Sequence, residues 1–178
     1  MQPVQALLII DVQLGSLAVV PESARLLERV GELLAKARAA GVLIVHVQND
    51  GVQATADAPG TPGWELHFGV EAGEPVVRKL QDDSFAGTPL AELLAAHEVQ
   101  AVAVCGLMSE MCVSATARTA LARGLRVVLP HDAHSTTGIP ATAAAPAISA
   151  ETVSRVADWA LGDELEAVEH ASEVSFSR

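Results

Sequence analysis

Aromatic residues are scarce in this sequence of 178 residues: they make up 3% of it, and tyrosine is absent. Half of the residues are nevertheless hydrophobic, which excludes a disordered chain. Ala, Val, Leu and Ile must therefore build most of the core. The length suits one folded unit, so we expect a single domain over residues 1–178.

Basic residues are also few: there are 11 Lys and Arg against 22 Asp and Glu, and the formal net charge is −11. A protein this acidic is repelled by the phosphate backbone of nucleic acids. It also lacks the interleaved aromatic and basic residues of single-strand binders. We therefore exclude nucleic acid as a partner. The excess of acidic residues by itself indicates no more than solubility.

Cysteines are limited to Cys105 and Cys112, which form no Cys-x-x-Cys motif and do not suggest a disulfide scaffold. No apolar run approaches the roughly 18 residues of a membrane span. The first residues include no basic region, and Asp11 interrupts their apolar run, so they do not resemble a signal peptide. These features predict a cytoplasmic protein with no membrane partner.

Strand-like and helix-like segments alternate along the chain. Short apolar runs typical of buried parallel strands occur at 6–10, 42–47, 75–79, 101–105, 125–129 and 165–169. Apolar residues at helical spacing occur at 22–40, after Thr88 and Pro89, at 113–121 and at 153–161. The alternation predicts an α/β fold, a three-layer sandwich with a mainly parallel, Rossmann-like sheet of about six strands. Ligands bind such sheets outside the carboxyl ends of the strands.

Three chemically active residues stand where predicted strands end. Asp11 directly follows 6–10, Lys79 is the last residue of 75–79, and Cys112 opens a helix after the loop that follows 101–105. Taken singly, these residues have ordinary explanations: a loop cap, a solvated amine and a small buried hydrophobe. Because parallel strands end at one edge of a sheet, we expect their side chains to meet. Cys105 lies inside its strand, and we expect it to be structural.

Together the three side chains suit acyl transfer through a thioester, followed by hydrolysis. A Cys at a helix N-terminus gains thiolate character from the unpaired amides, and a nearby ammonium adds to it. The carboxylate of Asp11 could take the thiol proton and later return it to a leaving amine. Backbone amides of the loop before the helix could hold an oxyanion.

The sequence resembles the isochorismatase-like cysteine hydrolase superfamily, which includes nicotinamidases, carbamoylsarcosine amidases and ureidoacrylate amidohydrolases. The resemblance rests on LLIIDVQ at 7–13, VVRKLQDDSFAGTPL at 76–90, VCGLMSEMCVSATARTAL at 104–121 and LPHDAHSTTG at 129–138. It implies that Asp11 is the general base, Lys79 the triad lysine and Cys112 the nucleophile. It also implies a homo-oligomer, a dimer or a tetramer.

The resemblance further implies a non-proline cis peptide at Leu107–Met108, with the backbone N–H groups of Met108 and Cys112 forming the oxyanion hole. The chain departs from the common pattern in two places. It has Asp83-Ser84-Phe85 where relatives often have Ser-Ala-Phe, and its nucleophile loop contains Met108 and Ser109. The shape of the substrate pocket therefore cannot be transferred from any one relative.

Candidate substrate-binding residues lie on segments expected to approach the strand ends. They are Gln13, Trp64, Phe85 and Ser109. Trp64 belongs to the long Gly- and Pro-rich excursion at 49–74, and long ordered loops tend to be functional. An indole there could form a pocket wall, but it could equally pin the loop or contact another subunit.

We expect neither a metal nor another cofactor. The nicotinamidase branch has an Asp-x-His metal motif after the second strand, but here Asp50 is followed by Gly51 and Val52. His131, Asp132 and His134 share one loop, which we interpret as loop capping. There is no G-x-G-x-x-G and no Walker motif.

The sequence thus predicts a metal-independent hydrolase of a small amide or N-carbamoyl compound, acting through a thioester on Cys112. The negative charge favours a neutral or weakly charged small-molecule substrate. One alternative is a vinyl-ether hydrolase of the isochorismatase type, a reaction that by resemblance does not need the Cys. Another is a binding or assembly protein that kept the fold without the activity.

Overall fold

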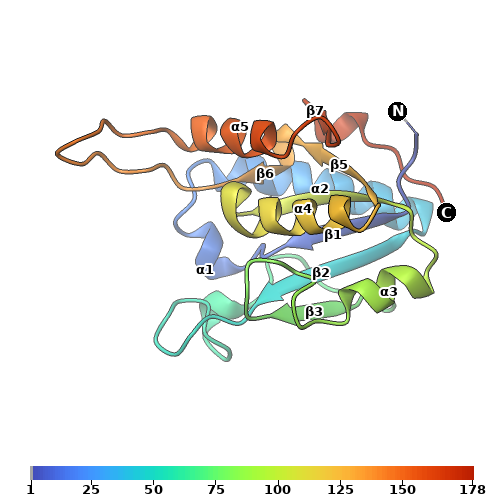
Figure 1. Ribbon diagram of the computed structural model, residues 1–178. Coiled ribbons are helices and arrows are strands. Elements are labelled where there is room, and N and C mark those ends of the chain that lie inside the picture. The colour runs from blue at the N-terminus through green and yellow to red at the C-terminus, as the bar shows by residue number, and fades with distance from the viewer. Residues whose placement is uncertain (1) are drawn as a thin grey trace.

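A parallel β-sheet forms the centre of the protein, which we describe over residues 2–178 of a computed structural model (Figure 1). The strand order is β3-β2-β1-β4-β5-β7, and the short strand β6 pairs only with β4. All the strand pairs are parallel. The predicted α/β sandwich with a mainly parallel sheet is therefore confirmed.

The strands and helices lie close to the predicted segments. The strands are β1 (Ala6–Ile10), β2 (Leu43–Asn49), β3 (Val76–Lys79), β4 (Ala101–Leu107), β5 (Arg126–Pro130), β6 (His134–Ser135) and β7 (Glu166–Val168). The α-helices are α1 (Leu14–Leu17), α2 (Ser23–Ala40), α3 (Leu90–Ala96), α4 (Ser114–Ala122) and α5 (Ala150–Ala160). Four shorter helical turns are η1 (Pro62–Trp64), η2 (Ser109–Val113), η3 (His131–Ala133) and η4 (Ala171–Glu173).

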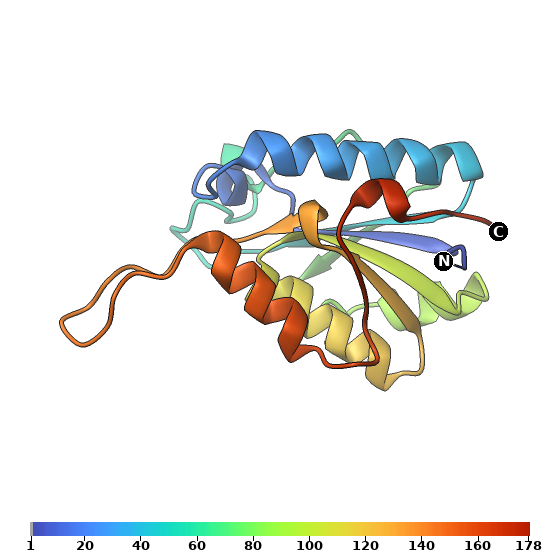
Figure 2. The same ribbon diagram turned by 90° about the horizontal axis from the view of Figure 1, so that it is seen from above.

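Helices cover both faces of the sheet, which makes three layers (Figure 2). Successive side chains of a strand point to opposite faces, so β1 contributes to two cores. Leu7 and Ile9 join the core under α2, whereas Leu8 and Ile10 join the core that includes residues of α3 and α4. A strand buried on both faces requires the continuous apolar run ALLII.

The structure adds two features that periodicity did not predict. Cys112 lies in η2, a π-helical turn, and the regular helix α4 begins only at Ser114. The strand β6 follows η3 and pairs with the end of β4 at Gly106 and Leu107. Both η2 and β6 lie at the carboxyl edge of the sheet, where Cys112 lies.

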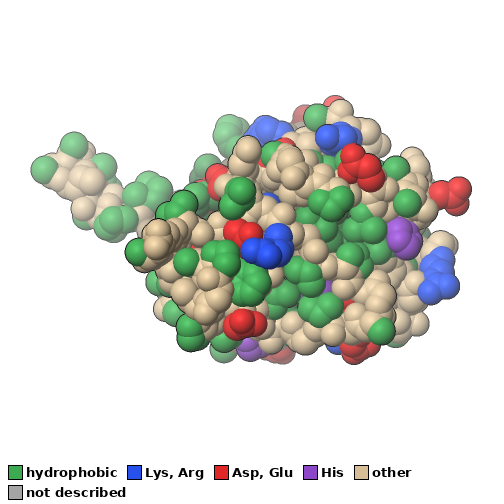
Figure 3. All heavy atoms as spheres, turned by 90° about the horizontal axis from the view of Figure 1, so that it is seen from below, with side chains coloured by type: hydrophobic (Ala, Val, Ile, Leu, Met, Phe, Trp, Pro, Cys, Tyr) green, Lys and Arg blue, Asp and Glu red, His purple; other side chains and the backbone are tan. Residues whose placement is uncertain are grey.

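An apolar arm, residues 139–148, stands out from the body between β6 and α5 (Figures 1 and 3). Its two ends pair through an antiparallel bridge between Ile139 and Ile148. Both isoleucines are exposed, at 50% and 40%. The dimer or tetramer expected from the resemblance stays a prediction.

Within residues 2–178, every helix is too short or too polar to cross a membrane.

Candidate active site

The three predicted catalytic residues meet at the carboxyl edge of the sheet. Lys79 Nζ lies 2.7 Å from Asp11 Oδ2 and 3.2 Å from Cys112 Sγ. Lys79 is only 2% exposed and Asp11 only 4%, whereas Cys112 is half-buried. One ammonium therefore contacts both the carboxylate and the thiol.

The order of the strands explains this meeting. β3, β2, β1 and β4 are neighbours, so Lys79 at the end of β3, Asp11 after β1 and Cys112 beyond β4 share one edge. Asp11 has a φ of +50°, in the left-handed region that Asp tolerates better than most residues. This local bend at the strand end helps to place its carboxylate beside Lys79.

Sequence reasoning missed Asn49 and Asp57. Asn49, the last residue of β2, accepts a hydrogen bond from Lys79 Nζ at 3.3 Å through its Oδ1. Its amide nitrogen donates to Asp57 Oδ2 at 2.7 Å. Lys79 thus uses its three N–H donors on Asp11, Asn49 and Cys112. The run at 42–47 predicted an earlier end for this strand, so the sequence did not mark Asn49 as a strand end, whereas in the structure β2 runs to Asn49.

Asp82 is a further carboxylate at the thiol. Its Oδ1 lies 3.6 Å from Cys112 Sγ, which donates to it, and the residue is exposed. Asp82 belongs to the segment after β3. It directly precedes Asp83-Ser84-Phe85, where the sequence departs from the Ser-Ala-Phe that relatives often have. It places a negative charge on the solvent side of the nucleophile.

Burial sets the proton affinities of the three central groups. It raises the pKa of the Asp11 carboxyl above its usual value, although the Lys79 ammonium opposes this rise. Burial also raises the pKa of the Cys112 thiol to about 12, with Asp11 adding to the rise and Lys79 opposing it. Burial acts to lower the pKa of Lys79, but the charges of Asp11 and Cys112 outweigh it and raise that pKa. At neutral pH Cys112 is therefore a thiol that needs a base, and not a preformed thiolate.

The nucleophile turn follows a backbone segment that only glycine allows. Gly106 has a φ of +118°, and a Cβ there would lie 2.1 Å from the backbone oxygen of Ile10. The next peptide bond, Leu107–Met108, is cis. Met108 precedes η2, and its carbonyl accepts from the N–H groups of Met111 and Val113.

Gln13 supports the site from behind and does not offer its side chain to a substrate. It is fully buried, its Nε2 donates to the backbone oxygens of Asn49 and Trp64, and its Oε1 accepts from the N–H of Asn49. The expectation that Gln13 binds substrate is therefore wrong. Its amide already has partners, and it joins the end of β2 to the 49–74 loop.

The contacts of Trp64 fit the alternative that it pins its loop. Its indole N–H donates to Asp50 Oδ1 at 2.9 Å, and the Arg78 guanidinium lies 5.0 Å from the ring centroid. Arg78 also donates to both carboxylate oxygens of Asp50. Asp50 is the Asp of the incomplete Asp-x-His motif, and through these contacts it holds the 49–74 loop against β3.

Phe85 and Ser109 are corrections too. Phe85 is 5% exposed and packs in the core with Leu90 and Leu94. The cavity it borders includes Val99 and Leu125, at the amino ends of β4 and β5, so it does not line the edge that holds Cys112. Ser109 is 1% exposed, and its hydroxyl contacts His134 Nδ1 at 2.8 Å and Ser154 Oγ at 2.9 Å. Both segments approach as expected, but their side chains point into the protein.

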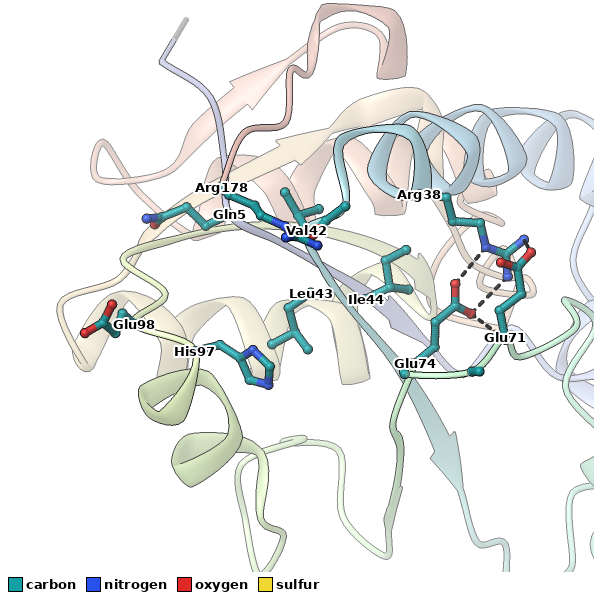
Figure 4. Close-up of a pocket in the computed structure, with 13 residues that line it drawn as sticks. Gln5, Arg38, Val42, Leu43, Ile44, Glu71, Glu74, His97, Glu98 and Arg178 are labelled. Atoms are coloured by element: carbon teal, nitrogen blue, oxygen red, sulfur yellow. Dashed lines mark hydrogen bonds and ion pairs between the residues drawn. The ribbon is translucent and has the colours of Figure 1, made fainter.

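A cavity of about 730 Å³ lies at the opposite edge of the sheet (Figure 4). Gln5, Leu43 and Glu98 line it, and these residues stand at or just before the amino ends of β1, β2 and β4. Arg38 and Glu74 pair across one side of it, at 2.7 Å. The cavity is thus separate from Asp11, Lys79 and Cys112.

Asp132 joins the loop before β6 to the turn η4. Its carboxylate accepts from the N–H of Ala171 at 2.7 Å and lies 3.2 Å from His170 Nδ1. His131 and His134 instead share a different carboxylate, that of Asp158. The three residues thus contact other segments, Asp132 the turn η4 and the two histidines the helix α5.

Comparison with known proteins agrees with this architecture. Two streptothricin hydrolases of Streptomyces noursei are 57% and 58% identical to the chain over 99% and 97% of its length, and the chain spans 72% and 65% of theirs. Two solved structures are also similar. An isochorismatase of Pseudomonas putida has a TM-score of 0.89 at 27% identity, covering 98% of this chain and 93% of its own. The N-carbamoylsarcosine amidase of Thermoplasma acidophilum has a TM-score of 0.68 at 25% identity, covering 75% and 84%.

The family model described as the isochorismatase domain matches residues 5–160, which include Asp11, Lys79 and Cys112. This match covers most of the chain, from before β1 to the end of α5. The chain belongs to the isochorismatase family of hydrolases.

Proposed function

We propose that this protein is a cysteine-dependent amidohydrolase that hydrolyses an amide bond of streptothricin or of a closely related compound. One observation supports the chemistry above all others: Lys79 Nζ contacts both the Asp11 carboxylate, at 2.7 Å, and the Cys112 thiol, at 3.2 Å. A cation shared by a buried base and a nucleophile can keep both in register and stabilise the thiolate as it forms.

In the first half of the reaction Asp11 takes the proton of the Cys112 thiol, and the sulfur attacks the amide carbonyl carbon. The C–N bond of the tetrahedral intermediate then breaks, Asp11 returns the proton to the leaving amine, and a thioester remains on Cys112. Among the described residues Asp11 Oδ1 has no hydrogen-bond partner, so this oxygen is available for the proton. The backbone N–H groups of Met108 and Cys112 are our candidates for the oxyanion hole.

In the second half Asp11 removes a proton from water, and the hydroxyl oxygen attacks the thioester carbonyl. The C–S bond breaks, which releases a carboxylic acid, and the thiolate recovers its proton. The raised pKa of Cys112, about 12, suits this last proton transfer, because it returns Cys112 to a protonated thiol. The whole cycle consumes one water and needs no other reactant.

The substrate is inferred from the relatives. The streptothricin hydrolases share more than half of their aligned residues with this chain. The more distant N-carbamoylsarcosine amidase shares its fold and is named as an amidase. The negative charge of the chain, −11, and the exposed Asp82 beside Cys112 suit an uncharged or cationic substrate better than an anion.

Hydrolysis of streptothricin by purified protein tests the proposal. Liquid chromatography with mass detection should show a product that has gained one water with wild type, and none with Cys112→Ala. Cys105→Ala is the matched control, because Cys105 is fully buried in the core and its loss should leave turnover in place. A mass increase on Cys112, trapped by rapid acid quenching, would reveal the thioester.

Other outcomes would point to the alternatives. Equal turnover by wild type and Cys112→Ala would remove the thioester mechanism and favour hydrolysis that needs no thiol, as in vinyl-ether cleavage. Failure to turn over streptothricin and a panel of amides and N-carbamoyl compounds, while the folded protein binds one of them, would favour a binding protein.

A further inference from the structure

A second cluster of ligating side chains lies beside the nucleophile turn and has no part in the proposed reaction. His131 Nδ1 lies 2.6 Å from Asp158 Oδ2, and His134 Nε2 lies 3.0 Å from Asp158 Oδ1. The ligating atoms of these three residues all lie within 4.8 Å of one another. The histidines come from η3 and β6, and the carboxylate comes from α5, which packs against both.

The contact between His134 and Asp158 is not a satisfied hydrogen bond. His134 Nε2 and Asp158 Oδ1 are both buried, and neither has a hydrogen-bond partner of acceptable geometry among residues 2–178. The side chain of His134 is 0% exposed. These two buried atoms lie 3.0 Å apart as an ion pair without a hydrogen bond, which costs free energy, and their close approach indicates that both are aimed at a common ligand.

The other ring nitrogen of His134 is already held. Ser109 Oγ lies 2.8 Å from His134 Nδ1, and Ser154 Oγ lies 2.9 Å from Ser109 Oγ. When Nδ1 donates to the serine hydroxyl, the lone pair of the ring is on Nε2 and faces Asp158. Histidines that ligate metal ions commonly have this kind of outer hydrogen bond, which fixes the ring and its tautomer.

Solvent ions have a path to the cluster. A cavity of about 470 Å³ borders His131, His134 and Ser154. A second cavity of about 350 Å³ borders His131 and Asp158. The side chain of His131 is 24% exposed and that of Asp158 13%, so the cluster is covered but not sealed.

The geometry points to a binding site for a divalent transition-metal ion, best filled by Zn²⁺, formed by His131 Nδ1, His134 Nε2 and the carboxylate of Asp158. Two imidazoles and a carboxylate suit Zn²⁺ better than Mg²⁺ or Ca²⁺, which prefer sets of oxygen ligands. The remaining position of a tetrahedron would be open to a water from either cavity.

This site would be structural. The chain from the metal through His134 to Ser109 ends in η2, the turn that contains Cys112, so a bound ion would tie α5 and the end of β5 to that turn. It would lie apart from the thiol and take no step in the thioester reaction. Its place also differs from the broken Asp50 motif after β2.

Isothermal titration calorimetry with ZnCl2 tests the site, on protein freed of metal by EDTA and then dialysed. The titrations use Cys112→Ala as the parent, so that binding to the catalytic thiol cannot be mistaken for this site. We expect one Zn²⁺ per chain in the parent. His131→Ala and Asp158→Asn, each added to it, should weaken binding at least about tenfold. His170→Ala is the matched control, because His170 is 67% exposed and pairs with Asp132.

Cobalt gives a second readout. Co²⁺ bound tetrahedrally should produce visible absorption bands in the parent and the His170→Ala control, and not in the two ligand variants. Circular dichroism checks folding, and Asp158→Asn keeps the shape of the side chain should His131→Ala fold poorly. Absence of binding in the parent, or equal binding in all variants, would overturn the site. Neither result bears on the thioester mechanism.

Discussion

Lys79 Nζ lies 2.7 Å from Asp11 Oδ2, and the two side chains are 0% and 6% exposed. Lys79→Met would leave the carboxylate buried without its cation. We expect a loss of about 3–5 kcal/mol in the free energy of unfolding and loss of the thioester intermediate. Urea denaturation measures the first effect. Mass spectrometry of acid-quenched enzyme measures the second.

Arg78→Met is the control for this substitution. Arg78 is the neighbouring cation on β3, and it pairs with Asp50. The side chain of Arg78 is 52% exposed, so loss of this ion pair should lower the free energy of unfolding by at most about 1 kcal/mol. Equal losses for the two variants would show that burial of the Lys79–Asp11 pair is unimportant to stability.

Asp11→Asn should separate the reactivity of Cys112 toward alkylation from its catalysis. The negative charge of Asp11 is one of the causes that raise the pKa of Cys112 to about 12. Removal of this charge should lower the pKa of the thiol, because Lys79 still stabilises the thiolate. Alkylation by iodoacetamide at pH 8 should become faster, by about tenfold for each unit that the pKa falls. Streptothricin hydrolysis should disappear, because the base is lost. Slower alkylation than in wild type would contradict the assignment of Asp11.

The acid limb of the rate profile should belong to Asp11. Burial raises the pKa of its carboxyl above the ordinary value of 3.8, and the base must be ionised to act. The ratio kcat/KM should therefore fall as the pH falls through a midpoint above 3.8. Circular dichroism over the same range separates this titration from unfolding. A profile that stays flat down to pH 4 in folded protein would disagree with a buried base.

Glu74 should contribute stability that depends on pH. Its hydrogen bond with Arg38 is the chief cause that lowers the pKa of Glu74 from 4.5 to about 2. Because the folded pKa is the lower one, the contribution is complete above pH 4.5 and is lost as the pH falls toward 2. Glu74→Gln should lower Tm at pH 7 more than at pH 2. Glu71→Gln, which removes the same charge from a side chain that is 64% exposed, should change Tm little at either pH.

Gly106→Ala should destabilise the junction between β1 and β4. The new Cβ would lie 2.1 Å from the Ile10 oxygen, at a φ of +118°, so the strands must separate or the turn must move. We expect a loss of more than about 2 kcal/mol and lower turnover. Gly87→Ala is the control, since its φ is +68° and no atom lies within 4 Å of its Cβ. Equal effects of the two would attribute the loss to φ alone.

Patterns in the sequence were informative where backbone geometry alone decides the outcome. Short apolar runs located β1 and β4, and the end of a parallel strand is an edge position whatever packs around it. Asp11, Lys79 and Cys112 could therefore be brought together before any contact was known. Asn49 was missed because the apolar run at 42–47 ends before it, whereas the folded strand β2 extends to Asn49.

The direction of side chains in loops was beyond such reasoning. Gln13, Phe85 and Ser109 lie on segments near the strand ends, yet each is 5% exposed or less. Gln13 turns toward the 49–74 loop, and Ser109 turns toward β6 and α5. These partners are far away in the sequence, so no local pattern reports on them.

The layers of the fold and the edge where the chemistry lies could be predicted, because apolar runs and strand ends are local properties of the chain. The polar groups around Lys79 could not, and neither could the fact that His131 and His134 share the carboxylate of Asp158 rather than that of the adjacent Asp132. Burial, proton affinity and ligand geometry depend on contacts between distant segments, and those contacts exist only after the chain has folded.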